Sequence, residues 1–248
     1  MKNATSFGRQ ATTYAKGRPG YPPELYDWIA ANSPNQETVW DAGTGSGQAA
    51  QDLAQYFEYV YATDISDAQI KAAASHEKVT YKIAAAEQSG LTENWADAVT
   101  VATAVHWFAS SEFWAEVARV GKSGALFCAW TYQLPRSTEA VDRDFLTPLY
   151  ELLDPYWAEG NRICMVGYSS ENLNCPYPQI ETPVFDAGAM WSVEQLVNFA
   201  KSWSAHFRAR EDGKALALDA LQTKFMRDYA DQTIAVSLPL SVLAVRIK

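Results

Sequence analysis

The chain is organised around Val39-Trp-Asp-Ala-Gly-Thr-Gly-Ser-Gly47, in which an apolar run ends at an acidic residue and breaks into three alternate glycines. A helix-like stretch, residues 48–56, follows directly. Glycines at such a point let the backbone turn tightly and approach a ligand without an intervening Cβ. The same pattern also describes a tight strand–helix turn that binds nothing. Its spacing, D-x-G-x-G-x-G, differs from the G-x-G-x-x-G of dinucleotide sites.

Strand-like and helix-like stretches alternate on both sides of this motif. Strands are expected at 37–41, 59–63, 79–83, 98–102 and 125–132. Helical spacing and capping residues indicate helices at 24–31, 48–56, 66–75 and 112–120. Strands separated by helices of this length form right-handed βαβ units and a buried parallel sheet. The apolar run within 238–248 suits a final strand.

Composition narrows the class of protein. The chain has 248 residues, 48% of them hydrophobic, which is enough for a sizeable core. A net charge of -9 disfavours nucleic-acid and anionic-membrane binding as main roles. Three cysteines without metal-like spacing favour reduced thiols and a cytoplasmic protein, with no metal. The first residues lack the apolar core of a signal peptide, and no stretch approaches 18 apolar residues.

The regular alternation weakens after residue 132. Residues 138–157 are expected to be mostly helical, and a capping-box pattern at Ser192 opens a predicted helix that runs to about 207. Another helix is predicted at 212–229. The predicted organisation is one domain with four parts: an N-terminal lid segment and helix (1–34), a cofactor-binding core (35–134), an inserted cap and acceptor region (135–190), and C-terminal helices with the final strand (191–248).

Two acidic residues follow the next two predicted strands. Asp64 ends the second strand, and its carboxylate can take both hydroxyls of a ribose. Glu87 follows the third strand, where an acid or a neighbouring backbone N–H can meet an adenine edge. Ligands of open α/β sheets bind beyond the carboxyl ends of the strands, so these residues predict an adenosine site.

These motifs resemble those of class I S-adenosylmethionine-dependent methyltransferases. The matching stretches are Asp41-Ala-Gly-Thr-Gly-Ser-Gly47, Ala62-Thr-Asp-Ile-Ser66, Ala85-Ala-Glu87 and Val105-His-Trp-Phe108. Further stretches resemble the trans-aconitate methyltransferase-like (methyltransferase type 11) branch of small-molecule enzymes: Tyr14-Ala-Lys-Gly-Arg-Pro19, Ala129-Trp-Thr-Tyr132 and Ser202-Trp-Ser-Ala205. The resemblance implies an α/β, Rossmann-like, seven-stranded doubly wound sheet with an antiparallel last strand and an inserted helical cap.

The resemblance also implies which residues hold the cofactor, S-adenosylmethionine. Gly43 and Gly45 would lie against its methionine part, and Asp41 would face its ammonium through water or Thr44. Asp64 would take the ribose hydroxyls. The remaining residues of the implied cofactor site are Tyr14, Arg18, Ala42, Ile65, Ala86, Glu87 and Thr103.

The acceptor is expected to be a small molecule with a reactive oxygen, such as a carboxylate. His106 is the candidate general base, although it equally suits packing against aromatic neighbours or positioning the substrate. Residues suggested for the acceptor pocket are Trp107, Trp130, Tyr132, Arg136 and Trp203, each of which is alternatively a core or surface residue. Two rivals remain: a cofactor-binding protein without acceptor chemistry, and an NAD(P)-dependent oxidoreductase. The sequence leaves the oligomeric state open.

Overall fold

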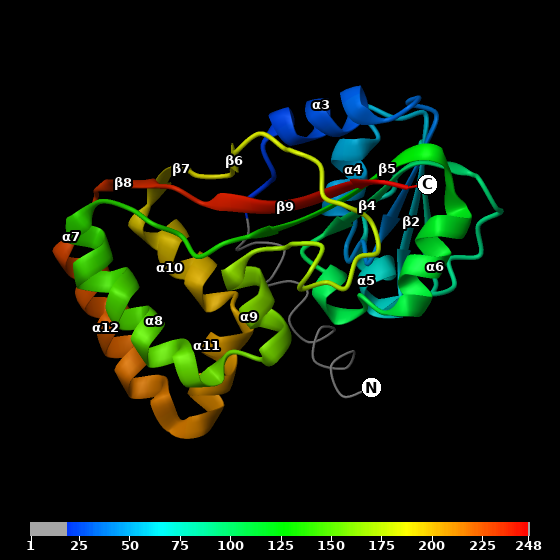
Figure 1. The fold of residues 1–248 in the computed structure, drawn as a ribbon. Coiled ribbons are helices and arrows are strands. Elements are labelled where there is room, and N and C mark those ends of the chain that lie inside the picture. The colour runs from blue at the N-terminus through cyan, green and yellow to red at the C-terminus, as the bar shows by residue number, and fades with distance from the viewer. Residues whose placement is uncertain (1–18, 248) are drawn as a thin grey trace.

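The computed structural model describes residues 19–247, which form a seven-stranded sheet in the order β3-β2-β1-β4-β5-β9-β6 (Figure 1). Its strands are β1 (Thr38–Ala42), β2 (Tyr59–Asp64), β3 (Val79–Ile83), β4 (Ala96–Ala102), β5 (Gly121–Tyr132), β6 (Phe185–Asp186) and β9 (Pro239–Arg246). β1 to β5 pair in parallel, whereas β9 runs antiparallel to both of its neighbours, β5 and β6. The predicted α/β doubly wound sheet with an antiparallel last strand is confirmed.

The strand order reverses beside β1. The chain moves outward from β1 to β2 and β3, then returns to place β4 on the other side of β1. The crevice at such a reversal, beyond the carboxyl ends of the strands, is where open α/β sheets bind ligands. The glycine-rich turn after β1 lies at this point.

Helices cover both faces of the sheet. On one face α3 (Pro23–Asn32) and α4 (Gln48–Leu53) pack on alternate residues of the strands, such as Val39. On the other face α6 (Ser111–Val120) packs through Phe113 and Val117 against the intervening residues, such as Trp40. α5 (Asp67–Ala72) connects β2 to β3. Both faces of the central strands β1, β4 and β5 are thus buried, as their apolar runs predict, whereas the edge strand β3 is partly exposed.

A lobe of helices lies beside the sheet at the carboxyl end of β5 (Figure 1). Its first part follows β5 and comprises α7 (Glu139–Val141), η2 (Asp142–Leu146), α8 (Thr147–Leu153), η3 (Asp154–Tyr156) and α9 (Glu159–Val166). Its second part comprises β7 (Ala189–Ser192), α10 (Val193–Lys201), α11 (Ser204–Ala209), η4 (Arg210–Lys214), α12 (Ala215–Asp228) and β8 (Thr233–Val236). α8 contacts both α11 and α12. The lobe therefore draws on residues from both sides of position 190.

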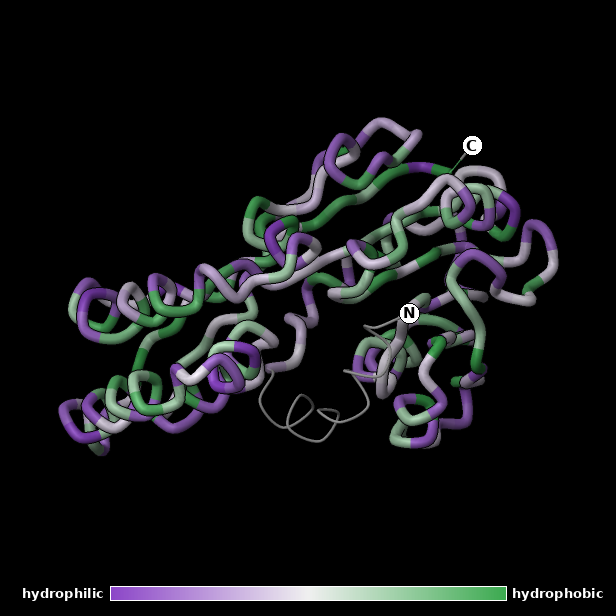
Figure 2. The backbone as a smooth tube through the Cα atoms, turned by 90° about the horizontal axis from the view of Figure 1, so that it is seen from below, coloured by the Kyte–Doolittle hydropathy of each residue, from purple (hydrophilic) through white to green (hydrophobic). Residues whose placement is uncertain are grey.

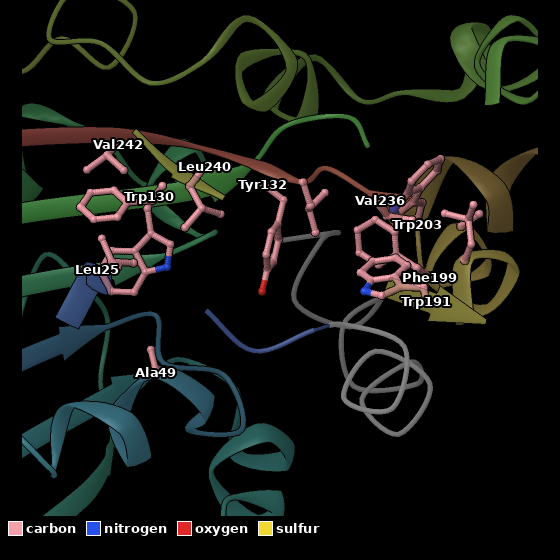
Figure 3. Packing of buried hydrophobic residues seen from close by; sticks show 14 of the residues in the cluster. Leu25, Ala49, Trp130, Tyr132, Trp191, Phe199, Trp203, Val236, Leu240 and Val242 are labelled. Atoms are coloured by element: carbon pink, nitrogen blue, oxygen red, sulfur yellow. The ribbon is translucent and has the colours of Figure 1, made fainter. Parts of the chain in front are cut away.

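One apolar core runs from the sheet into this lobe. Figure 3 shows the row of side chains from Leu25 and Trp130, past Tyr132, to Phe199 and Trp203. Hydrophobic residues concentrate along the strands, while hydrophilic residues recur on the outer turns of the lobe helices (Figure 2). Continuous burial of this kind fixes the lobe against the carboxyl end of β5.

The structure differs from the sequence-based prediction in the lobe. The helix predicted to open at the Ser192 capping box is confirmed, but its predicted run to about 207 is wrong. The helix ends at Lys201, and α11 begins after Trp203, whose extended backbone (φ -77°, ψ 137°) turns the ring into the core. The predicted helix at 212–229 begins late, at Ala215, because Gly213 adopts φ 81°. The two-stranded sheet of β7 and β8 was not predicted.

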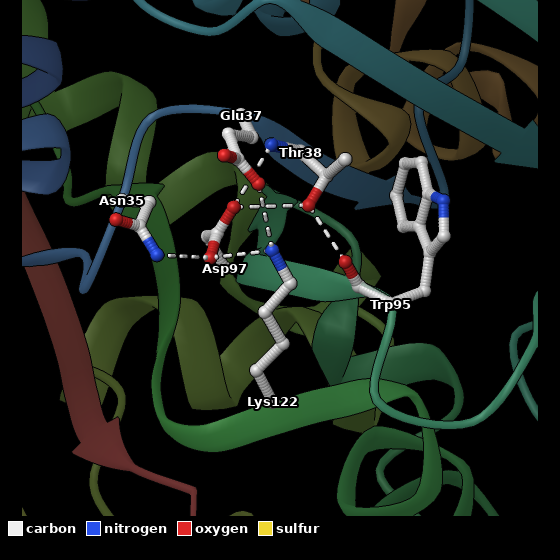
Figure 4. A network of polar contacts seen from close by, with 6 residues as sticks. All are labelled: Asn35, Glu37, Thr38, Trp95, Asp97 and Lys122. Carbon is white, nitrogen blue, oxygen red and sulfur yellow. Dashed lines mark hydrogen bonds and ion pairs between the residues drawn. The ribbon is translucent and has the colours of Figure 1, made fainter.

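A polar network ties together the amino ends of β1, β4 and β5 (Figure 4). Asp97 is fully buried and accepts hydrogen bonds from the backbone N–H of Thr38 at 3.0 Å and from Lys122 Nζ at 2.9 Å. Burial alone would raise the pKa of Asp97, but these hydrogen bonds outweigh it and lower the pKa. The network lies at the end of the sheet opposite the glycine turn.

Candidate functional site

A cavity of about 520 Å³ occupies the crevice at the strand-order reversal. Its walls come from the turn after β1, the ends of β2 and β4, and the loop after β3. The residues that line it are Tyr21, Gly43, Thr44, Gly45, Ser46, Gln48, Ala49, Asp64, Ile65, Ser66, Gln69, Ala84, Ala85, Ala86, Glu87, Ala102, Thr103, Ala104, Trp107 and Phe108. The structure therefore brings together most of the residues that the resemblance implies for the cofactor.

Two of the motif glycines are required for different reasons. Gly43 has φ 66°, and a Cβ there would lie 3.0 Å from both Ala104 Cβ and the Phe108 ring. Gly45 has φ 58°, but a Cβ there would meet nothing within 4 Å. The first glycine permits close packing of the turn on the segment after β4, whereas the second leaves open space beside the cavity.

Asp64 is fixed by backbone donors at the end of β2. One of its carboxylate oxygens accepts a hydrogen bond from Gly45 N at 2.9 Å, and the other accepts one from Ser66 N at 2.8 Å. Burial raises the pKa of this carboxyl, and the two backbone hydrogen bonds partly offset that rise. Asp64 lines the cavity, so the carboxylate presents oriented acceptors to a ligand with hydroxyl groups.

Asp41 lies behind the cavity wall rather than in it. Its carboxylate is fully buried and accepts hydrogen bonds from Thr44 Oγ1 at 2.5 Å and Thr100 Oγ1 at 2.9 Å. Burial raises its pKa to about 6, with the two hydroxyls opposing the rise. Ala42, also suggested for the site, is likewise buried and does not line the cavity. Thr44 does line the cavity, and its side chain therefore lies between Asp41 and a ligand bound there.

Thr103 adopts an unusual backbone conformation just beyond β4. Its φ of 53° is rare for a β-branched residue and marks local strain of the kind found at functional sites. Its N–H donates to Trp130 O at 2.7 Å, and its hydroxyl lies 3.1 Å from Tyr21 Oη. These contacts hold the turn after β4 against the end of β5.

Sequence reasoning did not single out Tyr21 or Gln48. Pro19 O accepts hydrogen bonds from Tyr132 Oη at 2.6 Å and from Gln48 Nε2 at 3.1 Å. Tyr21 stacks on Tyr132 with ring centroids 4.9 Å apart and also lines the cavity. The proline- and glycine-rich run before Tyr21 was the available signal. Two residues of that segment expected at the cofactor, Tyr14 and Arg18, lie outside the described residues.

A buried acid anchors the loop that carries Ala86 and Glu87. Ser89 donates to Glu116 Oε1 through its N–H at 2.8 Å and through its hydroxyl at 2.6 Å. Arg119 adds two hydrogen bonds of 2.7 Å to the same carboxylate. Burial acts to raise the pKa of Glu116, but these donors outweigh it and lower the pKa. The loop beside the cavity is thereby tied to α6.

A second, smaller cavity of about 60 Å³ lies between the end of β5 and the helical lobe. It is lined by Thr103, Thr131, Tyr132, Gln133, Leu134, Trp157, Asn161, Cys164, Met165, Phe199 and Trp203. Thr103 lines both cavities, which are therefore adjacent.

The residues suggested for the acceptor pocket fall in different places. Tyr132 and Trp203 line the second cavity, and Trp107 lines the first. Trp130 lines neither, because it is fully buried beneath Tyr21 and Tyr26. Arg136 also lines neither; its backbone pairs with Ser237.

His106 lies in η1 (Val105–Trp107) and faces α9 of the lobe. Its Nδ1 is 2.6 Å from Tyr168 Oη, and Cys164 Sγ lies 3.4 Å from the same nitrogen. Burial holds the pKa of Tyr168 well above its ordinary value, so this phenol stays protonated. His106 lines neither cavity, although its neighbours Trp107 and Cys164 do.

Neither a metal-binding cluster nor a membrane-spanning helix is found among residues 19–247. No three histidine, cysteine or acidic residues in this part of the chain are grouped so as to hold a metal ion. None of the helices described there is long and apolar enough to cross a membrane.

A doubly wound sheet with a glycine turn at its reversal and a carboxylate at the next strand end is typical of nucleoside-binding α/β proteins. Residues 40–129 match the family described as a methyltransferase domain. A solved structure from Anaeromyxobacter dehalogenans, described as a putative type II methyltransferase, is 34% identical with a TM-score of 0.85, covering 93% of this chain and 98% of that one. The chain belongs to the class I S-adenosylmethionine-dependent methyltransferase family.

One further relative agrees with this family, and a second solved structure shares the fold. A protein of Dictyostelium discoideum named as a methyltransferase is 27% identical over 227 residues, or 90% of this chain and 86% of its own length. The structure of the [4+2]-cyclase SpnF is 17% identical with a TM-score of 0.56 and covers 98% of this chain and 94% of that one. That last similarity shows the shared fold alone.

Proposed function

We propose that the protein transfers a methyl group from S-adenosylmethionine to an oxygen atom of a small molecule. The observation that carries the proposal is the pairing of Asp64 with the glycine turn around the larger cavity. Acidic and neutral groups line this cavity, and no lysine or arginine does so among the described residues. A nucleoside with a cationic amino-acid part suits such walls better than a pyrophosphate, which needs positive charge or N–H donors.

The lining residues fit the proposed cofactor part by part. Asp64 would accept hydrogen bonds from the ribose hydroxyls, because its oxygens are already oriented by Gly45 and Ser66. Ile65 and Ala86 would border the adenine, and the open space beside Gly45 would receive the methionine part. Asp41, held behind Thr44, would supply negative charge towards the ammonium.

The reaction requires little covalent chemistry from the protein itself. The sulfonium of S-adenosylmethionine supplies an activated methyl group, whose bonding electron pair stays on sulfur as the acceptor oxygen forms its bond to carbon. The protein positions the acceptor in line and excludes water. A hydroxyl acceptor also loses its proton, which would pass to solvent. His106 lines neither cavity and would act only through its wall neighbours Trp107 and Cys164.

The expected carboxylate acceptor has no cationic partner among the described lining residues. Three of the described arginines of the lobe have other partners: Arg143 pairs with Asp144, Arg162 with Asp154, and Arg208 donates to Tyr156 O. A hydroxyl acceptor needs no such partner. We therefore place a neutral oxygen acceptor ahead of a carboxylate in the proposal.

Binding and turnover measurements test the proposal separately. Isothermal titration should give saturable binding of S-adenosylhomocysteine, the product of the cofactor, and no comparable binding of NAD. Tight binding of NAD alone would instead indicate an oxidoreductase. Radiolabelled methyl transfer should then be measured over alcohols, phenols, carboxylic acids and amines. Binding of S-adenosylhomocysteine without transfer to any class would point to a cofactor-binding protein, or to other chemistry on the shared fold.

A further inference from the structure

We infer that the second cavity receives the reacting group of the acceptor and selects an uncharged hydroxyl over a carboxylate or an ammonium. This inference rests on the proposed function and adds the substrate class. The position of the second cavity supports the inference, because Thr103 belongs to the walls of both cavities. A group in the second cavity therefore lies next to whatever the larger cavity holds.

The walls of the second cavity are aromatic or apolar on several sides. Trp203 lies 5.7 Å from Trp157 and 5.5 Å from Phe199, measured between ring centroids. Tyr132 and Phe199 meet edge to face at 6.3 Å. Trp203 and Phe199 are themselves almost fully buried, so their positions are fixed by the core. Such walls favour an apolar body on the acceptor.

None of the described residues around this cavity carries a full charge of either sign. No aspartate, glutamate, lysine or arginine belongs to its lining between residues 19 and 247. Arg162 is next in sequence to the lining residue Asn161, but it extends to Asp154 at 3.1 Å. A carboxylate or ammonium placed here would lose water without gaining an opposite charge, whereas a neutral hydroxyl would lose much less.

Two carboxamides provide the polar contacts that a hydroxyl needs. Asn161 Oδ1 accepts a hydrogen bond from Ser204 Oγ at 3.2 Å, which orients its amide nitrogen as a remaining donor. Gln133 has its backbone N–H bound to Pro239 O, and its side-chain amide has no hydrogen-bond partner in the described part of the chain. An amide both donates and accepts, so it complements a hydroxyl, which does the same.

The size of the cavity limits what enters it. At about 60 Å³ it is far smaller than the larger cavity of about 520 Å³. The cavity therefore suits the hydroxyl and the first few atoms of an acceptor. The rest of the acceptor would lie outside it, on the side that the two cavities share at Thr103.

The test compares probes of one ring that differ in the charge of the reacting group. Phenol, benzoate and benzylamine are neutral, anionic and cationic, respectively, at about pH 7.5. Each is titrated by calorimetry into protein saturated with S-adenosylhomocysteine. Phenol should bind at least tenfold more tightly than either charged probe. Equal or tighter binding of benzoate or benzylamine, or no binding of any probe, would overturn the inference.

Variants locate the site and separate the two proposals. Asn161→Leu and Gln133→Leu should each weaken phenol binding about tenfold while leaving S-adenosylhomocysteine binding unchanged, which also verifies folding. Arg162→Gln is the matched control beside Asn161 and should change neither phenol binding nor S-adenosylhomocysteine binding. If phenol binding survives both leucine variants, the acceptor lies elsewhere and the inference is wrong. If S-adenosylhomocysteine fails to bind the unaltered protein, the proposed function itself fails.

Discussion

The Asp64 carboxylate accepts a hydrogen bond from the backbone N–H of Gly45, joining the ends of β1 and β2 over 2.9 Å. The two residues are separated by 19 positions in the chain but line one cavity. The bond links the two parts of the site proposed to hold the ribose and the methionine part. It also explains why a glycine turn alone is a weak signal, since the turn is oriented by a side chain of the next strand.

Asp64→Asn should weaken binding of S-adenosylhomocysteine roughly 10- to 150-fold, because hydrogen bonds to a charged group contribute about 1.5–3 kcal/mol. The amide also brings an N–H₂ group towards the backbone donors of Gly45 and Ser66. Calorimetric titration of the two proteins measures the change. Asp67→Asn is the control, because Asp67 is exposed and pairs only with Lys71 on α5 among the described residues. Unchanged affinity in Asp64→Asn would mean that Asp64 does not hold the ribose.

Asp41 should make the protein less stable as the pH rises from about 4 to 7. Its pKa is raised by burial from 3.8 to about 6 in the folded state, so the folded protein retains a proton that the unfolded chain has lost. Folding is therefore favoured below this interval and loses this advantage as the pH passes through about 6. The difference corresponds to about 3 kcal/mol, at 1.36 kcal/mol per pH unit.

Asp41→Asn removes this titration and gives the comparison that isolates it. Urea unfolding of both proteins at intervals between pH 4 and pH 8 measures the difference in the free energy of unfolding. The variant should gain stability relative to the unaltered protein as the pH rises, and the gain should level off above about pH 7. A difference that is constant across the range would show that Asp41 titrates normally in the folded protein.

Local signals predicted much of the fold and part of the site. The glycine turn and the helix cap at Ser66 act within a few residues, and α5 starts at Asp67, directly after that cap. Long-range packing decided the rest. Trp130 and Tyr132 point to the same face of β5, yet Trp130 is covered by the core while Tyr132 reaches the second cavity. The sequence around Trp130 and Tyr132 does not show where along β5 the packed core ends.

Gly43→Ala and Gly45→Ala should have different effects. Alanine at either position adopts a left-handed conformation that costs about 1–2 kcal/mol. At Gly43 the new Cβ also lies 3.0 Å from Ala104 Cβ and the Phe108 ring, and such overpacking adds about 1–3 kcal/mol. Gly43→Ala should therefore unfold at lower urea concentration than Gly45→Ala. In Gly45→Ala the new Cβ enters open space beside the cavity. For the same loss of stability, this variant should therefore lose more affinity for S-adenosylhomocysteine than Gly43→Ala does. The reverse order in both measurements would contradict these assignments.

Lys122→Met should reduce stability without altering the site. Asp97 is fully buried, and removing its cationic partner leaves an uncompensated charge among Thr38, Asn35 and the amino ends of three strands (Figure 4). Breaking a buried pair costs about 3–5 kcal/mol; because the Lys122 side chain is 28% exposed, we expect the lower end of that range. Urea unfolding measures the loss, and Lys71→Gln, which removes an exposed pair with Asp67, should change stability little. The affinity for S-adenosylhomocysteine should stay within twofold of that of the unaltered protein, because the network and the cavity lie at opposite ends of the strands. A large change in affinity for S-adenosylhomocysteine at unchanged stability would contradict this prediction. It would mean that a change at the amino ends of the strands alters the cavity at their carboxyl ends.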